Sequence, residues 1–368
     1  MYACDPSGRL SQVSKNGLVS AIYSYDPNSN RTQVQRGTAK TKATYDAQDR
    51  LLTYGGRKYT YTLQGDRLLR YTDNNPNKVE YQYDSLGALQ KAVRTTFNAT
   101  TGVTTVNTFD YLNDGLGRRI VRKKDGVVQK RFAYDESGRL VAELNANGKI
   151  KSHFVYATRS HTPDYMIQGA VKYKFVHDHL GSVRMIINSA SGEIKSKMSY
   201  DEFGVLQPGS IAPDFTPFGF AGGIRDSATG LVRFGVRDYD PETGRWTSKD
   251  PILFRGGDTN LYGYVLQDPV NLVDPSGLLF EGIIGDHTTP GQQAGIGAGL
   301  LTGGVIAIRT GIMTLNPALA IGGGFSAYEG IRNIQHARDR GFEIQIPGLD
   351  QIPDFSNNNR GSDNVCKR

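Results

Sequence analysis

Three aspartates between residues 238 and 274 could hydrolyse a peptide bond. Asp238 directly follows Arg237, Asp250 precedes a proline, and Asp274 opens the stretch Asp-Pro-Ser-Gly-Leu. Hydrolysis by carboxylates needs one ionised group to activate water and one protonated group to protonate the carbonyl oxygen or the leaving amine. Two carboxylates held close together meet this need, because repulsion between like charges raises the pKa of one of them. A neighbouring arginine can keep one carboxylate ionised and polarise the carbonyl group.

The same aspartates could instead be turn residues. An Asp-Pro pair favours the start of a turn, and the Asp-Pro pair at 240–241 is expected to do only that. For Asp250 and Asp274 taken singly, a turn role is the default interpretation. Their position relative to the rest of the chain therefore has to decide between the two roles.

An abrupt change in composition follows the last of these aspartates. Up to residue 278 the chain is rich in Tyr, Gly and Arg, and beyond it come Gly-rich apolar stretches and a polar tail. The charge changes at the same place. Residues 279–368 hold seven Lys and Arg against eight Asp and Glu, so the positive excess of the chain lies on residues 1–278. We expect a repetitive β scaffold joined to a separate terminal payload, with a cleavage point between them.

The first 210 residues repeat the pattern aromatic-x-aromatic-Asp, in several places at a spacing of about twenty residues. Aromatic side chains at i and i+2 share one face of a strand. Asp followed three residues later by Gly suits a type I turn. Each unit is therefore predicted to be a β-hairpin, and the hairpins should stack and bury their tyrosines together. The basic residues recur once per repeat, which favours a scaffold role over a nucleic-acid patch. Clear repeats begin at Tyr23, Tyr81 and Phe132, and a variant with methionine in place of the first aromatic residue begins at Met198.

These repeats and the sequence after them resemble the rearrangement hotspot (RHS) or YD-repeat family over residues 1–278. Residues 177–184 are similar to a signature strand of the family, and residues 230–264 are similar to its RHS repeat-associated core. The resemblance implies a mainly β fold, in which stacked YD-repeat hairpins form a spiralling sheet that is part of a hollow shell. It also implies a scaffold at 1–210, a core with a self-cleavage motif at 211–278, and a variable C-terminal toxin at 279–368.

Members of this family release their C-terminal toxin by self-cleavage, so the resemblance implies a site. It places an aspartic-type autoprotease on Asp238 and Asp250, with Arg237 in support. Leu253 departs from the family pattern, which has glycine there, and the altered turn could slow or abolish cleavage. The implied cleavage motif, with the cut between Leu278 and Leu279, comprises Asp274, Pro275, Gly277, Leu278 and Leu279.

The residue after the implied cut helps to choose the mechanism. Leu279 has neither a hydroxyl nor a thiol group, so an N-to-O or N-to-S acyl shift would have no nucleophile. Hydrolysis by carboxylates remains. His177 and His179 would share a strand face, but no further ligand is visible nearby, so we favour a structural role for both. No metal and no cofactor is predicted.

The payload begins with an apolar stretch, residues 295–315, that is about long enough to cross a bilayer as a helix. Gly295, Gly299 and Gly303 would place a flat stripe on one face of that helix, which favours close helix packing. We therefore expect a small, α-helical, Gly-rich C-terminal region that inserts into a membrane. The alternative is a pair of buried helices, or a linker that stays inside the shell.

Two other functions remain open. A nuclease-type tail could use His336 with Arg338 and Arg340, but residues 279–368 carry a net charge of about −1 and offer no electrostatic footprint for nucleic acid. We therefore do not expect nucleic acid as a partner. The other alternative is a structural or adhesive surface module that never cleaves.

The family resemblance also implies partners. A separate immunity protein is expected to bind residues 279–368. Shells of the family contain several times more repeats than this chain. Either a longer shell-forming chain or a component of a secretion apparatus is therefore a further expected partner, or the chain is a displaced fragment or a truncated reading frame. Residues 1–20 show no secretory signal, and we expect export by a route that does not use one, to the cell surface or beyond.

Overall fold

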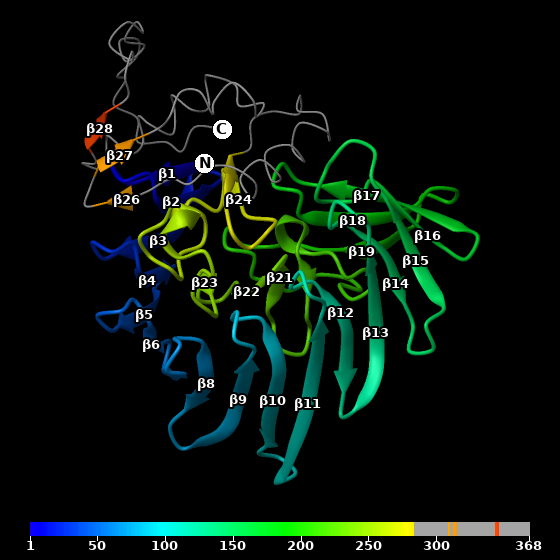
Figure 1. Ribbon diagram of the computed structural model, residues 1–368, viewed down its shortest axis with the longest axis horizontal. Coiled ribbons are helices and arrows are strands. Elements are labelled where there is room, and N and C mark those ends of the chain that lie inside the picture. Colours follow the sequence, from blue (N-terminus) through cyan, green and yellow to red (C-terminus); the bar gives the residue numbers. More distant parts are fainter. Residues whose placement is uncertain (283–307, 310–311, 315–342, 346–368) are drawn as a thin grey trace, which may run out of the picture. The chain divides into compact units, whose positions relative to one another are not determined.

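The computed structural model describes residues 1–282, 308–309, 312–314 and 343–345 (Figure 1). These residues belong to two compact units. The first unit holds every described residue up to Gly282, and the second holds three short strands.

The first unit is dominated by one antiparallel sheet of nineteen strands, in which each strand pairs with the next one along the chain. The mainly β fold built from stacked hairpins is therefore confirmed. The strands are β1 (Tyr2–Cys4), β2 (Leu10–Lys15), β3 (Leu18–Tyr25), β4 (Arg31–Arg36), β5 (Ala39–Tyr45), β6 (Leu51–Tyr54), β7 (Arg57–Tyr61), β8 (Arg67–Thr72), β9 (Asn75–Tyr83), β10 (Leu89–Asn98), β11 (Val103–Asn113), β12 (Arg119–Lys124), β13 (Val127–Tyr134), β14 (Leu140–Leu144), β15 (Ile150–Val155), β16 (Tyr165–Gln168), β17 (Val171–His177), β18 (Val183–Asn188) and β19 (Ile194–Lys197).

The turn between β13 and β14 shows what the repeat sequence does. The Gly138 amide donates to the Asp135 carbonyl (3.0 Å), and the φ angle of Gly138 is +78°, a conformation that favours glycine. The Asp135 carboxylate accepts the amide (2.9 Å) and the side-chain Nε (2.7 Å) of Arg139. The same Asp-to-Arg pairing recurs at Asp5–Arg9, Asp46–Arg50 and Asp114–Arg118.

Each such arginine also contacts the next repeat. The Arg139 guanidinium lies 5.2 Å from the centre of the Tyr156 ring, and the Tyr156 hydroxyl donates to the Leu140 carbonyl (2.9 Å). Arg118 and Tyr134 make the equivalent stacking contact at 5.1 Å. The Tyr, Asp and Arg of the motif thus tie successive hairpins together through cation–π contacts and hydrogen bonds. At these positions the repeated arginines are part of the scaffold.

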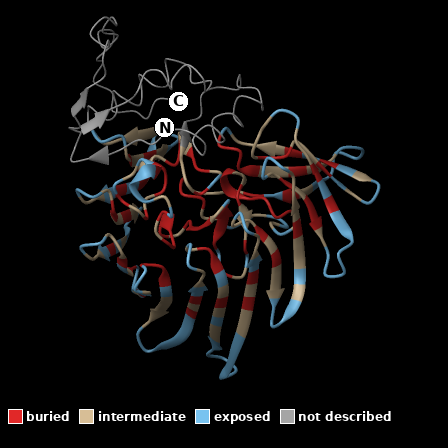
Figure 2. Cartoon of the chain, in the orientation of Figure 1, coloured by how far each residue is buried: buried red, intermediate tan, exposed pale blue. Residues whose placement is uncertain are grey.

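A short antiparallel sheet lies inside the curve of the long one, as Figure 1 shows. Contacts from distant repeats reach this sheet and the residue after its first strand: Arg67 pairs with Asp240 (2.6 Å), and the Tyr111 hydroxyl donates to Asp226 (2.8 Å). In Figure 2 the buried residues gather around this short sheet, while the hairpin tips of the long sheet are exposed. Its strands are β20 (Ile224–Arg225), β21 (Val232–Phe234), β22 (Arg237–Asp240) and β23 (Arg245–Trp246).

A final hairpin closes the first unit. Strand β24 (Leu272–Val273) pairs antiparallel with β25 (Glu281–Gly282), so residues 274–280 form the loop between them. Three 3-10 turns accompany this region: η1 (Phe220–Gly222), η2 (Leu253–Gly256) and η3 (Val265–Gln267). The predicted cleavage motif therefore lies in a loop whose two ends are held together.

The second unit contains β26 (Ile308–Arg309), β27 (Ile312–Thr314) and β28 (Glu343–Gln345). The prediction of a helix through residues 295–315 is wrong over β26 and β27, where β-branched isoleucine and threonine favour extended backbone. Among the residues that the structure describes, no helix combines the length and the apolar character needed to cross a bilayer. The residues of the helix stripe and of the alternative nuclease set lie outside the described residues: Gly295, Gly299, Gly303, His336, Arg338 and Arg340.

Candidate self-cleavage site

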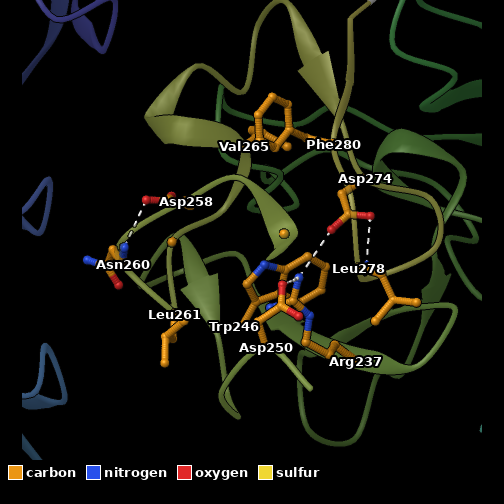
Figure 3. Close-up of a pocket in the computed structure, with 12 residues that line it drawn as sticks. Arg237, Trp246, Asp250, Asp258, Asn260, Leu261, Val265, Asp274, Leu278 and Phe280 are labelled. Atoms are coloured by element: carbon orange, nitrogen blue, oxygen red, sulfur yellow. Dashed lines mark hydrogen bonds and ion pairs between the residues drawn. The ribbon is translucent and has the colours of Figure 1, made fainter. Parts of the chain in front are cut away.

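A small pocket lies where β22, the segment leading into η2, and the loop 274–280 meet (Figure 3). Its volume is about 20 Å³, enough for one water molecule. Three of the residues that line it are charged groups proposed from the sequence: Arg237, Asp250 and Asp274. Leu278, the residue before the implied cut, also lines it. The fold therefore brings together residues that lie up to 41 positions apart in the sequence.

Arg237 is at the centre of the site, as Figure 3 shows. Its Nη2 atom lies 2.9 Å from Asp250 Oδ2 and 3.3 Å from Asp274 Oδ2. Its Nε donates to the Gly277 carbonyl at 2.5 Å, and its guanidinium lies 4.1 Å from the centre of the Trp246 ring. One buried positive charge is thus shared by two carboxylates and holds the backbone of the cleavage loop.

Two glycines let the loop approach the β21–β22 turn. A Cβ on Gly235 would lie 2.0 Å from the Ser276 carbonyl oxygen, and a Cβ on Gly277 would lie 2.5 Å from the Phe234 carbonyl oxygen. Gly277 also has a φ angle of +68°. The Val236 amide donates to the Ser276 carbonyl (3.1 Å) across this contact. Because neither glycine has a side chain, the loop can pack directly against the β21–β22 turn and lie close to Arg237.

The two carboxyl groups differ in their surroundings. Burial raises the pKa of Asp274 to about 6, although Arg237 and the hydrogen bonds from Ser276 and the Leu278 amide (3.1 Å) oppose the shift. Burial also raises the pKa of Asp250, again against the charge of Arg237. A carboxyl group that titrates near neutral pH beside a second one is the arrangement that acid–base hydrolysis requires.

The carbonyl of Leu278 faces the same space as Asp250. A Cβ on Gly256 would lie 2.6 Å from Asp250 Oδ2 and 3.0 Å from the Leu278 oxygen, so both groups border one point in the pocket. Leu253, in the turn after Asp250, has a φ angle of +55°. This left-handed conformation explains why glycine suits the position, and Leu253 adopts it at a steric cost of about 1–2 kcal/mol.

Asp238 lies elsewhere. Its carboxylate pairs with Arg119 (3.0 Å) and Arg233 (2.6 Å), all three being buried. Because Asp238 follows Arg237 in β22, the two side chains point to opposite faces of the strand. The structure therefore brings Arg237 to the pocket with Asp250 and Asp274, and it does not bring Asp238 there. This alternation is a signal that the sequence already contains.

Sequence reasoning also missed residues that shape the pocket. Trp246 supports the Arg237 guanidinium, and Gly256 leaves the space between Asp250 and Leu278. Within the cleavage loop beside the pocket, the Ser276 hydroxyl accepts a hydrogen bond from the Leu279 amide. Gly256 and Trp246 carried no local signal for this role. Of the two histidines weighed as metal ligands, His177 stacks on Phe175 with ring centroids 5.6 Å apart, and His179 Nε2 lies 2.8 Å from the Val270 carbonyl.

A meander of Tyr-Asp turns around a short core sheet defines a YD-repeat shell protein. Residues 1–270 match the family model described as Teneurin YD-shell, and the chain belongs to this family. The resemblance to YD-repeat proteins noted in the sequence is thereby confirmed.

Relatives include both animal and bacterial proteins. The chain is 29% identical over 283 residues to Teneurin-1 of Mus musculus, covering 74% of this chain and 10% of that protein. It is 27% identical over 340 residues to Double-stranded DNA deaminase toxin A of Burkholderia cenocepacia (strain H111), covering 79% of this chain and 23% of that protein. A solved structure, the crystal structure of TcdB2-TccC3-TEV, is 19% identical with a TM-score of 0.43, over 71% of this chain and 13% of that one. The chain thus spans about a tenth to a quarter of the length of these relatives.

Proposed function

We propose that this chain is the C-terminal part of an exported RHS/YD-repeat toxin that cuts its own Leu278–Leu279 bond and releases the residues beyond it as an effector. The observation that carries the proposal is that Arg237 joins Asp250 and Asp274 beside the Leu278 carbonyl, in a pocket with room for one water molecule. The similarity to a protein named as a DNA deaminase toxin supports the toxin class.

In the proposed reaction Asp250 is the general base. It takes a proton from water, and the water oxygen attacks the Leu278 carbonyl carbon. Asp274, whose pKa is raised to about 6, supplies the proton that the departing amine needs. The positive charge of Arg237 stabilises the negative charge that develops on the oxygen of the reacting carbonyl. Asp274 takes the place given to Asp238 in the sequence-based hypothesis.

The released effector is proposed to act on membranes, with a nuclease-type activity as the alternative. Leakage of dye from liposomes treated with the isolated tail would support the membrane activity. Degradation of DNA or RNA by the same tail would support the nuclease alternative. An immunity protein that binds residues 279–368, and a longer chain that completes the shell, are the proposed partners. Co-purification of the tail with the product of a neighbouring gene would test the first of these.

The test of self-cleavage is the intact mass of the purified chain under denaturing conditions. Wild type should give two polypeptides that meet at Leu278–Leu279, whereas Asp250→Asn and Asp274→Asn should each give one uncut chain. Asp135→Asn, which changes a carboxylate in a repeat turn, is the control and should cut like wild type. An uncut wild type would contradict the proposal and favour a structural or adhesive module. Normal cutting by Asp250→Asn would contradict the mechanism.

A further inference from the structure

The hydroxyl of Ser276 lies between a carboxyl group and the nitrogen of the bond to be cut. Its Oγ atom is 3.0 Å from Asp274 Oδ1 and 3.3 Å from the Leu279 amide nitrogen. It also accepts a hydrogen bond from the Leu278 amide at 3.2 Å. The Leu279 nitrogen is the atom that leaves in the proposed reaction, so Ser276 directly contacts a reacting atom.

Hydrolysis of an amide requires a proton on the leaving nitrogen, because an amide anion is a very poor leaving group. In the loop, the Ser276 hydroxyl donates to Asp274 Oδ1 (3.0 Å) when Asp274 is ionised, and across the same distance a protonated Asp274 can donate to the hydroxyl oxygen. The Leu279 amide nitrogen is hydrogen-bonded to the Ser276 hydroxyl oxygen. The hydrogen-bonded path from the buried acid to the leaving nitrogen therefore passes through Ser276.

We propose that Ser276 is a catalytic residue that relays a proton from Asp274 to the Leu279 nitrogen. The inference rests on the proposed self-cleavage. The water oxygen forms a bond to the Leu278 carbonyl carbon, and a water proton goes to Asp250. As the carbon–nitrogen bond breaks, the Leu279 nitrogen takes the hydroxyl proton of Ser276, and Ser276 takes the proton of Asp274.

The proton balance of this step closes. Leu278 ends as a carboxylic acid and Leu279 as an amine, while Ser276 regains its hydroxyl. Asp274 is left ionised and Asp250 protonated. In the planar amide the Leu279 nitrogen donates to Ser276, and in the tetrahedral intermediate that nitrogen becomes pyramidal and can accept from the same hydroxyl. No co-reactant other than water is required.

A merely structural role for Ser276 has to be separated from a relay, because its hydroxyl also caps the loop through two backbone amides. Three variants make the distinction. Ser276→Ala removes both roles, and Ser276→Thr keeps a hydroxyl. Ser276→Asn keeps an acceptor for the amides and a donor for Asp274, but its amide group does not pass a proton on. Ser276 as a residue is exposed, so the larger side chains have room.

The experiment follows the full-length chain after pulse labelling in cell-free synthesis and measures the rate at which the uncut form disappears. The relay predicts near wild-type cleavage for Ser276→Thr and a loss of about 100-fold for both Ser276→Ala and Ser276→Asn. Cleavage of Ser276→Asn as fast as that of Ser276→Thr would show a capping role and overturn the relay. So would a wild-type rate for Ser276→Ala, or a rate for Ser276→Thr as slow as that of Ser276→Ala.

In each of these outcomes the wild-type chain still yields two polypeptides, so the proposed self-cleavage stands even where the relay fails. An uncut wild-type chain is different. It would overturn both the self-cleavage and the relay, and the two failures are therefore distinguishable.

Discussion

The two faces of strand β22 carry opposite arrangements of charge. On one face a single carboxylate, Asp238, is held by two arginines, Arg119 and Arg233. On the other face a single arginine, Arg237, is shared by two carboxylates, Asp250 and Asp274. Both clusters are buried, and both are joined through residues adjacent in the sequence. Only their stoichiometry and their neighbours differ.

The difference indicates that the cluster around Asp238 stabilises the fold, whereas the cluster around Arg237 is suited to catalysis. With two guanidinium groups around it, Asp238 joins the long sheet at Arg119 to the short sheet at Arg233. On the other face one guanidinium is shared by two carboxyl groups, so one positive charge cannot neutralise both. Burial raises the pKa of Asp274 there to about 6. A group that gains and loses a proton near neutral pH is suited to catalysis. Substitutions at the pocket, on the opposite face of β22 and in the repeats can test this division.

Filling the pocket should stop the reaction without harming the fold. In Gly256→Ala the new methyl group would lie 2.6 Å from Asp250 Oδ2, and Gly256 has no positive φ angle that would add strain. Because a displacement of about 1 Å in an active site costs roughly 100-fold in rate, we expect cleavage to slow at least that much. The measurement is the uncut fraction by mass. Gly115→Ala, where a Cβ would meet nothing within 4 Å, is the matched control. Unchanged cutting in Gly256→Ala would contradict the site.

Removing the charge of Asp238 should chiefly destabilise the protein. Asp238→Asn leaves two buried guanidinium groups without a counter-charge, and breaking a buried ion pair costs about 3–5 kcal/mol. The free energy of unfolding in urea should fall by that amount when Asp238→Asn is added to an uncut Asp250→Asn chain. A loss below about 1 kcal/mol would mean that the two faces of β22 do not divide their roles as proposed.

The pH dependence of stability should report Asp274. Its pKa is near 3.8 in the unfolded chain and about 6 in the fold, so between these pH values the folded state keeps a proton that the unfolded state has lost. Stability should therefore fall as the pH rises from about 4 to about 6, by on the order of 3 kcal/mol. The comparison is between Asp250→Asn and Asp250→Asn/Asp274→Asn in urea at pH 4 and pH 7. Because the charge of Asp250 contributes to the raised pKa of Asp274, the change in this background should be smaller than in the unsubstituted chain. Equal slopes in the two chains would rule out Asp274 as the source.

The smallest effect is expected from an arginine of the repeats. Arg139 pairs with Asp135 and stacks on Tyr156, but its side chain remains 32% exposed. Arg139→Ala should lower the free energy of unfolding by less than about 1 kcal/mol and leave cleavage unchanged. A loss as large as that of Asp238→Asn would show that the turn pairs, and not the core clusters, dominate stability.

Local patterns in the sequence predicted the scaffold well. Asp135 and Gly138 specify their turn through contacts a few residues apart, and aromatic residues at alternate positions specify the buried face. The pairing of Asp238 with Arg119 spans 119 residues and has no local signal, so it appears only once the long sheet encloses the short one. Family resemblance located Asp250 and Asp274, but it could not show that Asp274, and not Asp238, shares Arg237 with Asp250.

The tail shows the opposite failure. A run of apolar residues with regularly spaced glycines predicted a helix, yet Ile308–Arg309 and Ile312–Thr314 are strands. Apolar composition alone does not distinguish a buried strand from a buried helix, and β-branched side chains shift the balance toward the strand.

The pairing of β24 with β25 gives the cut a second stage. The bond between Leu278 and Leu279 lies inside the loop, whereas Val273 and Glu281 are paired across its base. Phe280, on the far side of the bond, packs on the same hydrophobic cluster as Trp246. After the bond is cut, the two parts of the chain would therefore stay associated. The tail would dissociate only when the β24–β25 hydrogen bonds and the packing of Phe280 are broken. Cleavage and release would then be separate steps. Acid–base chemistry would determine the rate of the first, and the stability of a two-residue strand pairing would determine the rate of the second.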